Sequence, residues 1–169
     1  MKNIILIGMP GAGKSTMGVV LAKTLGLAFI DTDILVQENA GRLLQEIIDA
    51  EGPGAFLERE EKTILSQNFK NTVIATGGSV VFSETAMAHL KKNGVVIYLA
   101  ISFEKMEERL GNITTRGIVL VAGQSLRGMY DQRLLFYEKY ADITIDCEDD
   151  DFERRIANVI EELSTFPAP

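Results

Sequence analysis

The sequence predicts a single three-layer α/β domain, in which helices cover both faces of a parallel sheet. Short apolar runs rich in β-branched residues alternate with longer stretches whose apolar residues recur at helical spacing. The apolar runs are almost uninterrupted by polar residues, which is typical of strands buried on both faces. At 169 residues, the chain is long enough for one such domain and short for two.

Five apolar runs are expected to be strands, and most of the sequence between them is expected to be helical. The expected strands are residues 2–7, 27–30, 72–76, 95–99 and 143–145. The expected helices are residues 14–25, 34–69 with breaks at Gly41 and 52–54, 83–92, 103–110, 126–140 and 152–163. Residues 111–123 lack a clean period and are expected to form a loop. Polar residues follow the first three strands directly, at the edge where ligands bind in parallel sheets.

Residues 8–16 read Gly-Met-Pro-Gly-Ala-Gly-Lys-Ser-Thr and match the phosphate-loop pattern. They follow an expected strand and begin an expected helix, so free backbone N–H groups and the helix dipole favour phosphate there. A glycine-rich turn without a ligand is the alternative, and the full pattern in its required context disfavours it. The Lys14 ammonium would contact the β- and γ-phosphates, and the Ser15 hydroxyl would ligate Mg²⁺. The expected nucleotide-binding residues of this loop are Gly11, Ala12, Gly13, Lys14, Ser15 and Thr16.

Two aspartates and two glycines follow the second and third expected strands. Asp31 and Asp33 can both emerge beside the phosphate loop, where one carboxylate could hold hydrated Mg²⁺ and one could orient or deprotonate an attacking hydroxyl. A solvated turn that caps the next helix is the alternative. Gly77 and Gly78 would let a substrate approach the backbone closely, and a plain tight turn is their alternative.

Three arginines are candidates for contacts with the nucleotide or the substrate, and a solvated surface position is the alternative for each. Arg116 lies in the irregular stretch, where it could close over a triphosphate and stabilise the transferred phosphoryl group. Arg109 ends the preceding helix, where an adenine could stack on its guanidinium. Arg133 lies on the following helix and could instead pack against Tyr137.

Composition narrows the classes of partner. The net charge of −7 disfavours a duplex nucleic acid, which needs clustered Lys and Arg. The single cysteine, Cys147, excludes an internal disulfide and fits a reducing compartment. The sequence has neither a signal-peptide pattern nor eighteen consecutive apolar residues. We therefore expect a cytoplasmic protein that has neither nucleic acid nor membrane as a partner. We also expect a monomer.

Taken together, these motifs resemble the shikimate kinase family over almost the whole chain. The matching residues are the phosphate loop at 8–16, Asp-Thr-Asp at 31–33, Gly-Arg at 41–42, Thr-Gly-Gly at 76–78, and arginines at 116 and 133. The resemblance implies a five-stranded parallel sheet in the order 2-3-1-4-5, a helical substrate insert at about 33–65 and a lid at about 111–124. It also implies transfer of the γ-phosphate of ATP to the 3-hydroxyl of shikimate, with Mg²⁺ as cofactor.

The resemblance assigns a role to each matching residue. Asp31 would act near Mg²⁺ with Ser15, and Asp33 would hold the shikimate hydroxyls and serve as the base. Gly77 and Gly78 would line the substrate, and Arg133 would bind its carboxylate. The expected catalytic residues are thus Lys14, Asp33 and the lid arginine, Arg116.

The sequence also departs from the family pattern at the acceptor side. Leu57 follows Phe56, where the family usually carries an arginine that pairs with the shikimate carboxylate. Arg59 comes two residues later, about 200° around a helix, and is expected to face away. Ser79 stands in place of a third glycine, and the lid has Thr-Arg-Gly at 115–117 where the family commonly shows Arg-Pro.

Three functions are therefore weighed. The first is a shikimate kinase in which Arg133 holds the carboxylate alone or with a shifted group. The second is a kinase of the same fold that acts on another small alcohol, which Leu57 would suit. The third is a nucleotide-binding regulator without phosphoryl transfer. It is disfavoured because a pure binder needs no carboxylate to orient an acceptor, and the chain combines Lys14, Asp31, Asp33 and Arg116.

Overall fold

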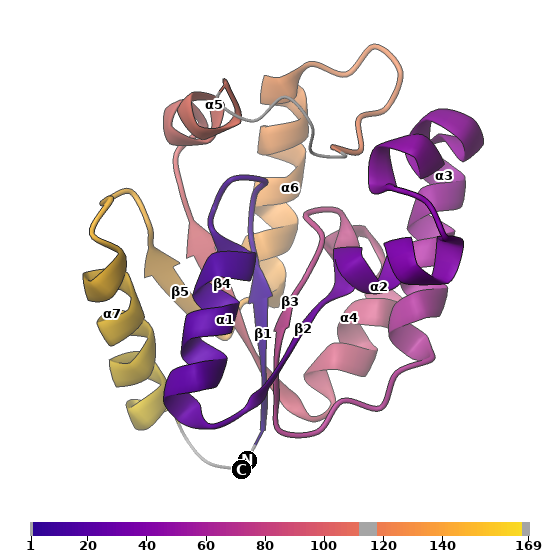
Figure 1. The fold of residues 1–169 in the computed structure, drawn as a ribbon. Coiled ribbons are helices and arrows are strands. Elements are labelled where there is room, and N and C mark those ends of the chain that lie inside the picture. Colours follow the sequence, from indigo (N-terminus) through magenta and orange to yellow (C-terminus); the bar gives the residue numbers. More distant parts are fainter. Residues whose placement is uncertain (1, 112–117, 167–169) are drawn as a thin grey trace.

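The computed structural model describes residues 2–111 and 118–166. Within these ranges, five strands form one parallel sheet in the order β2-β3-β1-β4-β5 (Figure 1). The fold class and the strand order expected from the sequence are therefore confirmed. The strands are β1 (Asn3–Ile7), β2 (Ala28–Asp31), β3 (Thr72–Ala75), β4 (Gly94–Ala100) and β5 (Ile143–Asp146). The helices are α1 (Lys14–Leu25), α2 (Thr32–Ala40), α3 (Leu44–Leu65), the short 3₁₀ helix η1 (Val80–Phe82), α4 (Glu84–Lys91), α5 (Phe103–Gly111), α6 (Leu126–Tyr140) and α7 (Phe152–Thr165).

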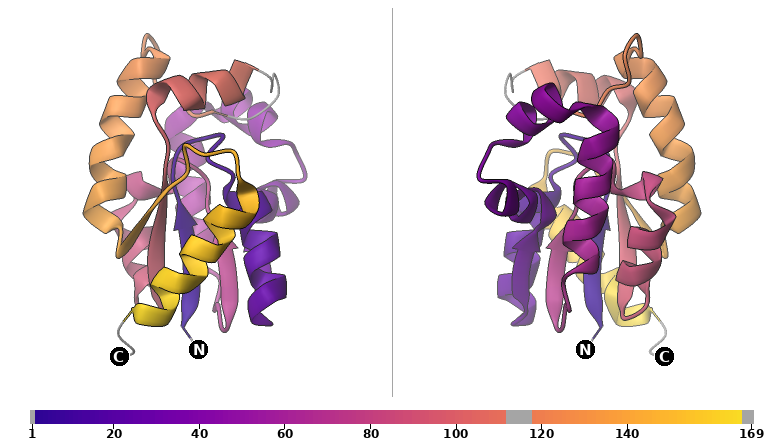
Figure 2. Two further views of the ribbon diagram at one scale, coloured as in Figure 1. Left: turned by 90° about the vertical axis from the view of Figure 1, so that its left-hand side faces the viewer. Right: turned by 90° about the vertical axis from the view of Figure 1, so that its right-hand side faces the viewer.

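Helices cover both faces of the sheet. Seen edge-on, α1 and α7 lie on one face and α4 and α6 on the other (Figure 2). Helices α2 and α3 pack against each other on the β2 side of the molecule (Figure 1). Among the described residues, no helix combines the length and the apolar character needed to cross a membrane.

Burial explains the strand sequences. All five residues of β1 are buried, because this central strand pairs with β3 on one side and β4 on the other and is covered on both faces. At the edge of the sheet, β5 instead alternates between buried and exposed residues. The uninterrupted apolar runs were thus a correct indication of a sheet with two covered faces.

The segment expected as one interrupted helix over 34–69 forms two helices. Gly41, with a φ of 65°, ends α2 in the left-handed region. Helix α3 is kinked at Gly52, which has a φ of 83° and is followed by Pro53. Beyond the kink, Phe56 and Glu60 are four residues apart and share the buried face of the helix.

A small second apolar cluster joins α2 and α3 to the segment before α6. Its buried members are Val36, Ile47, Ile48, Phe56 and Val119. Leu57 packs against this cluster and is partly buried. The second cluster therefore fixes the part of α3 that comes after the kink.

Candidate active site

The phosphate loop lies between β1 and α1, at the carboxyl edge of the sheet. Gly13 occupies the N-cap position of α1 with a φ of 92°, a left-handed conformation that favours glycine. The backbone N–H groups of the first turn of α1 therefore face the loop, as an anion site requires.

Lys14 is held within this loop. Its Nζ donates to the backbone oxygens of Gly8 and Met9, at 2.7 and 2.9 Å, and the residue is only 9% exposed. The charge of the lysine is thus already placed at the loop that the sequence assigns to phosphate.

The expected metal ligands lie next to each other. Ser15 Oγ donates to Asp31 Oδ2 at 2.5 Å, and the other oxygen of Asp31 accepts a hydrogen bond from the Asp33 backbone N–H at 2.9 Å. Asp31 is therefore the N-cap of α2 as well, so the capping alternative and the expected site are compatible. No group of three or more His, Cys, Asp or Glu residues suited to a metal occurs in the described ranges. A hydroxyl and one carboxylate fit Mg²⁺, which commonly keeps waters and takes substrate phosphates as its other ligands.

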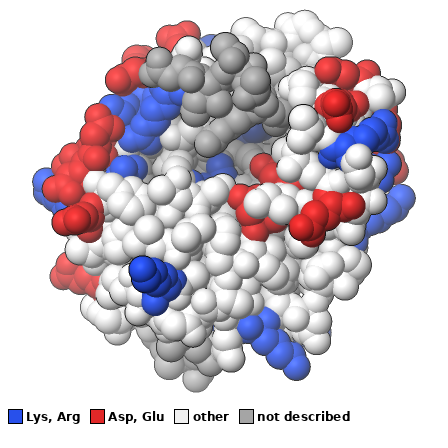
Figure 3. Space-filling view, in the orientation of Figure 1, with Lys and Arg blue, Asp and Glu red and all other residues white. Residues whose placement is uncertain are grey.

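A cavity of about 230 Å³ connects the phosphate loop to the candidate acceptor residues. Lys14 and Ser15 line it on one side, and Asp33, Gly77, Gly78 and Arg133 line it on the other. In Figure 3, Lys and Arg side chains are visible within the hollow in the upper half of this face, and Asp and Glu side chains gather on both sides of it. The chain is acidic overall, yet its cavity contains two cationic side chains.

The turn after β3 is tightly surrounded by polar groups. A Cβ on Gly77 would collide with Glu60 Oε1 and Asp33 Oδ1, and one on Gly78 would lie 2.7 Å from Arg133 Nη1. Because neither glycine has a side chain, three polar side chains can approach this backbone. Tyr137 further fixes the turn by donating its hydroxyl to the backbone oxygen of Gly78 at 2.6 Å.

Arg133 is a buried cation beside this turn. It is 1% exposed, and its Nη2 donates to the backbone oxygen of Val119 at 2.7 Å. Its Nε has no hydrogen-bond partner among the residues described, and no carboxylate in those ranges forms an ion pair with it. A buried guanidinium without a carboxylate, lining a cavity, is suited to an anionic ligand.

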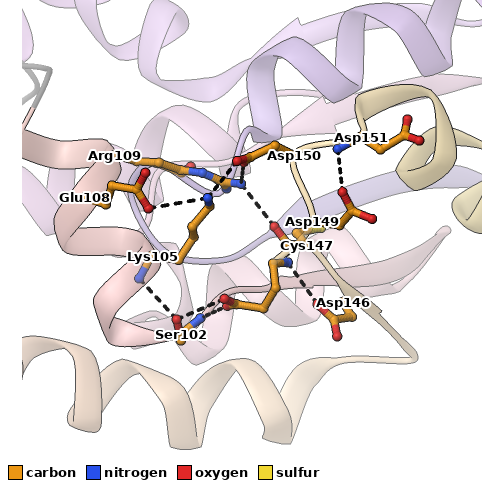
Figure 4. A network of polar contacts seen from close by, with 11 residues as sticks. Ser102, Lys105, Glu108, Arg109, Asp146, Cys147, Asp149, Asp150 and Asp151 are labelled. Carbon is orange, nitrogen blue, oxygen red and sulfur yellow. Dashed lines mark hydrogen bonds and ion pairs between the residues drawn. The ribbon is translucent and has the colours of Figure 1, made fainter.

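Arg109 reaches over the phosphate loop from α5. Its guanidinium donates to the backbone oxygens of Gly11 and Cys147, at 3.2 and 3.1 Å. Asp150 accepts from Arg109 at 3.3 Å and from Lys105 at 2.9 Å, so the loop before α7 is tied to α5 (Figure 4). The structure thus places Arg109 beside the nucleotide loop, and stacking on adenine stays a prediction.

Two residues around the departure from the family pattern on α3, Leu57 and Arg59, lie outside the cavity. Arg59 pairs with Glu51 at 2.9 Å and does not line the cavity, so the expectation that it faces away is confirmed. Leu57 does not line the cavity either and packs against the second apolar cluster. The predicted lid includes residues 112–117, so Arg116 lies outside the described residues.

Sequence reasoning missed Glu60. This residue is 2% exposed, and burial raises the pKa of its carboxyl from 4.5 to about 8, with the neighbouring Asp33 carboxylate acting in the same direction. Three groups lower the pKa of Glu60. The largest effect comes from the hydrogen bond of Ser79, followed by the charges of Arg133 and then Lys14. The signal in the sequence was the spacing of Glu60 from Phe56, which places both on one helix face.

Comparisons with known proteins identify the family of this chain. The shikimate kinase family profile matches residues 10–164. The shikimate kinase of Caldanaerobacter subterraneus subsp. tengcongensis is 37% identical over 163 residues, covering 95% of this chain and 95% of that protein. The shikimate kinase of Actinobacillus succinogenes is 36% identical over 170 residues, covering 98% of this chain and 97% of that protein.

Solved structures give the same result. Shikimate kinase from Acinetobacter baumannii in complex with shikimate has a TM-score of 0.85 at 30% identity, covering 99% of this chain and 96% of that chain. Shikimate kinase from Aquifex aeolicus vf5 has a TM-score of 0.80 at 29% identity, covering 96% of each chain. The chain therefore belongs to the shikimate kinase family of ATP-dependent phosphotransferases.

Proposed function

We propose that this protein transfers the γ-phosphate of ATP to the 3-hydroxyl of shikimate. The observation that carries this proposal is Arg133, a buried guanidinium that lines the same cavity as Lys14 and Asp33. Such a cavity can hold an acceptor with a carboxylate at one end and a hydroxyl near the phosphate loop at the other.

The proposed reaction uses the residues as follows. Asp33 accepts the proton of the acceptor hydroxyl, whose oxygen bonds to the γ-phosphorus while the bond to the bridging oxygen of ADP breaks. Lys14 stabilises the negative charge of the transferred group, and Arg133 pairs with the acceptor carboxylate. Mg²⁺ would be held by Ser15 Oγ and Asp31 and would neutralise charge on the phosphates. Arg116 stays the proposed lid arginine, and Arg109 the proposed contact to adenine.

The test is a coupled ADP-release assay on shikimate and on a panel of small alcohols that lack a carboxylate. Turnover of shikimate with the highest kcat/KM in the panel is expected. A higher kcat/KM for an uncharged alcohol would favour the second candidate, for which the specific observation is that Leu57 stands where the family usually has an arginine. Binding of ATP without turnover of any acceptor would indicate the regulator instead.

Replacing Arg133 by methionine should raise the KM for shikimate by a factor of about 10 to 100. Methionine keeps most of the buried volume but removes the charge-assisted hydrogen bonds, which are worth about 1.5–3 kcal/mol. The matched control is Arg127→Met on the same helix, because Arg127 is exposed and pairs with Asp131 outside the cavity. Equal KM values for the two variants would show that Arg133 does not bind the acceptor.

Replacing Leu57 by arginine should lower the KM for shikimate by about tenfold or more. Leu57 does not line the cavity but the adjacent Phe56 does, so the longer side chain of arginine is expected to reach into it. Its guanidinium would restore the family residue and supply one further charge-assisted pair to the acceptor carboxylate. Leu65→Arg is the control, because Leu65 is 38% exposed at the far end of α3. No gain from Leu57→Arg, combined with negligible turnover by the unmodified protein, would contradict shikimate as the acceptor.

A further inference from the structure

Glu60 lies directly behind the turn formed by Gly77–Ser79. Its Oε2 accepts a hydrogen bond from Ser79 Oγ at 2.9 Å, and this carboxyl is almost fully buried. Its Oε1 has no hydrogen-bond partner in the described part of the chain. Oε1 and Asp33 Oδ1 both lie against Gly77, so an ionised Glu60 would place a second negative charge beside the candidate base.

The groups facing Glu60 come from every element packed around it. Asp33 faces it from α2 and Lys14 from α1, while Arg133 and Tyr137 face it from α6. Glu61, the next residue of α3, accepts a hydrogen bond from Ser83 at the start of α4. Leu57 lies about one helical turn before Glu60 on α3, so this position provides no positive charge beside Glu60. No ion pair joins Glu60 to Arg133, although the structure describes both.

We propose that Glu60 is a positioning residue that works as a neutral carboxylic acid behind the acceptor site, and that its ionisation weakens the binding of an anionic acceptor. The inference rests on the proposed function, because it takes a carboxylate-bearing acceptor held by Arg133. While Glu60 is neutral, it accepts from Ser79 and leaves the guanidinium to the acceptor. Once ionised, Glu60 repels the acceptor carboxylate and competes with it for Arg133.

The direction of the pH effect follows from this arrangement. The acceptor carboxylate is ionised throughout the range from pH 7 to 9. Of the two carboxyl groups, only that of Glu60 therefore changes its charge in this range. Because burial raises the pKa of Glu60 to about 8, the fraction of protein competent to bind falls above that pH. The KM for shikimate should therefore rise by about tenfold between pH 7 and pH 9, in proportion to the loss of the competent form.

The experiment compares KM for shikimate at pH 7 and pH 9 in the unmodified protein and in Glu60→Gln. Glutamine has nearly the same shape, can still accept from Ser79, and cannot ionise. The expected ratio of the two KM values is about ten in the unmodified protein and about one in Glu60→Gln. The matched control is Glu61→Gln, the neighbouring acid that contacts Ser83, which should keep the ratio of the unmodified protein. The KM for ATP, measured in the same series, should change alike in all three proteins.

A second variant guards against failure of Glu60→Gln to fold. Ser79→Ala removes the hydroxyl that lowers the pKa of Glu60, so the rise in KM should begin at a higher pH. The same ratio in the unmodified protein and in Glu60→Gln, or an unmoved rise in Ser79→Ala, would overturn the proposal about Glu60.

A readout without turnover separates this proposal from the proposed function. The infrared difference spectrum between the unmodified protein and Glu60→Gln should contain a protonated carboxyl band at pH 7 that disappears by pH 9. Absence of this band would overturn the role of Glu60 whatever the acceptor is. Failure to phosphorylate shikimate at every pH would instead overturn the proposed function.

Discussion

Replacing Lys14 by alanine should lower kcat by a factor of about 100 to 1,000, the usual effect of removing one preorganised donor to developing negative charge. The ammonium lies within the phosphate loop, where it donates hydrogen bonds to the backbone oxygens of Gly8 and Met9. When ATP binds, these contacts can be exchanged for the β- and γ-phosphates, whose charge grows during transfer. Because the charge is needed most in the transition state, the loss should be larger in kcat than in the KM for ATP.

The control for this variant is Lys23→Ala on the same helix, because Lys23 is exposed and belongs to the last turn of α1. Steady-state kinetics of both variants, together with thermal unfolding, would separate catalysis from folding. We expect some loss of stability in Lys14→Ala, since two buried backbone oxygens lose a charged donor. A kcat within threefold of the unmodified protein would contradict the assignment of Lys14.

The parts of the site that could be predicted from sequence are those fixed by local patterns. The phosphate loop is a contiguous stretch between a strand and a helix, and its context is visible in the residues on either side. Asp31 and Asp33 directly follow a strand, so parallel topology alone brings them to the edge that carries the loop. For these residues, the order of the chain contains nearly all the required spatial information.

The parts that sequence reasoning missed depend on contacts between distant segments. Asp150 pairs with Arg109 and Lys105, which are more than forty residues away in the sequence. That contact exists because β4 and β5 are neighbours, which brings the segments after them together. Asp151, in contrast, does cap α7 by accepting from the Arg154 backbone N–H at 3.0 Å, a local contact that could be predicted.

The burial of Glu60 likewise depends on contacts between distant segments. An acidic residue in the run Glu58-Arg59-Glu60-Glu61 is expected on a solvated helix face, and its neighbours Glu58 and Arg59 do reach solvent. The kink at Gly52 and the packing of Phe56 set which side of α3 faces the sheet, and Glu60 shares that side. The spacing from Phe56 places Glu60 on the same face of the helix, but only the tertiary arrangement shows that this face is buried.

Burial of this carboxyl should also make the stability of the protein depend on pH. In the folded protein the pKa of Glu60 is about 8, whereas the ordinary value is 4.5. Between these two pH values the folded state keeps a proton that the unfolded state has lost. The free energy of unfolding should therefore fall as pH rises through this window, by up to about 5 kcal/mol from this one group.

The variant Glu60→Gln should remove that dependence, because glutamine is neutral in both states at every pH. Urea unfolding at pH 5, 6.5, 8 and 9 would measure the difference in unfolding free energy between the variant and the unmodified protein. That difference should grow in favour of Glu60→Gln as pH rises from 5 to 8 and then level off. Glu61 is partly exposed, so Glu61→Gln is the control. Its difference in unfolding free energy from the unmodified protein should change little with pH. A difference for Glu60→Gln that stays constant between pH 5 and pH 8 would mean that the buried carboxyl gains its charge without cost, and that water or a cation reaches Oε1 in solution.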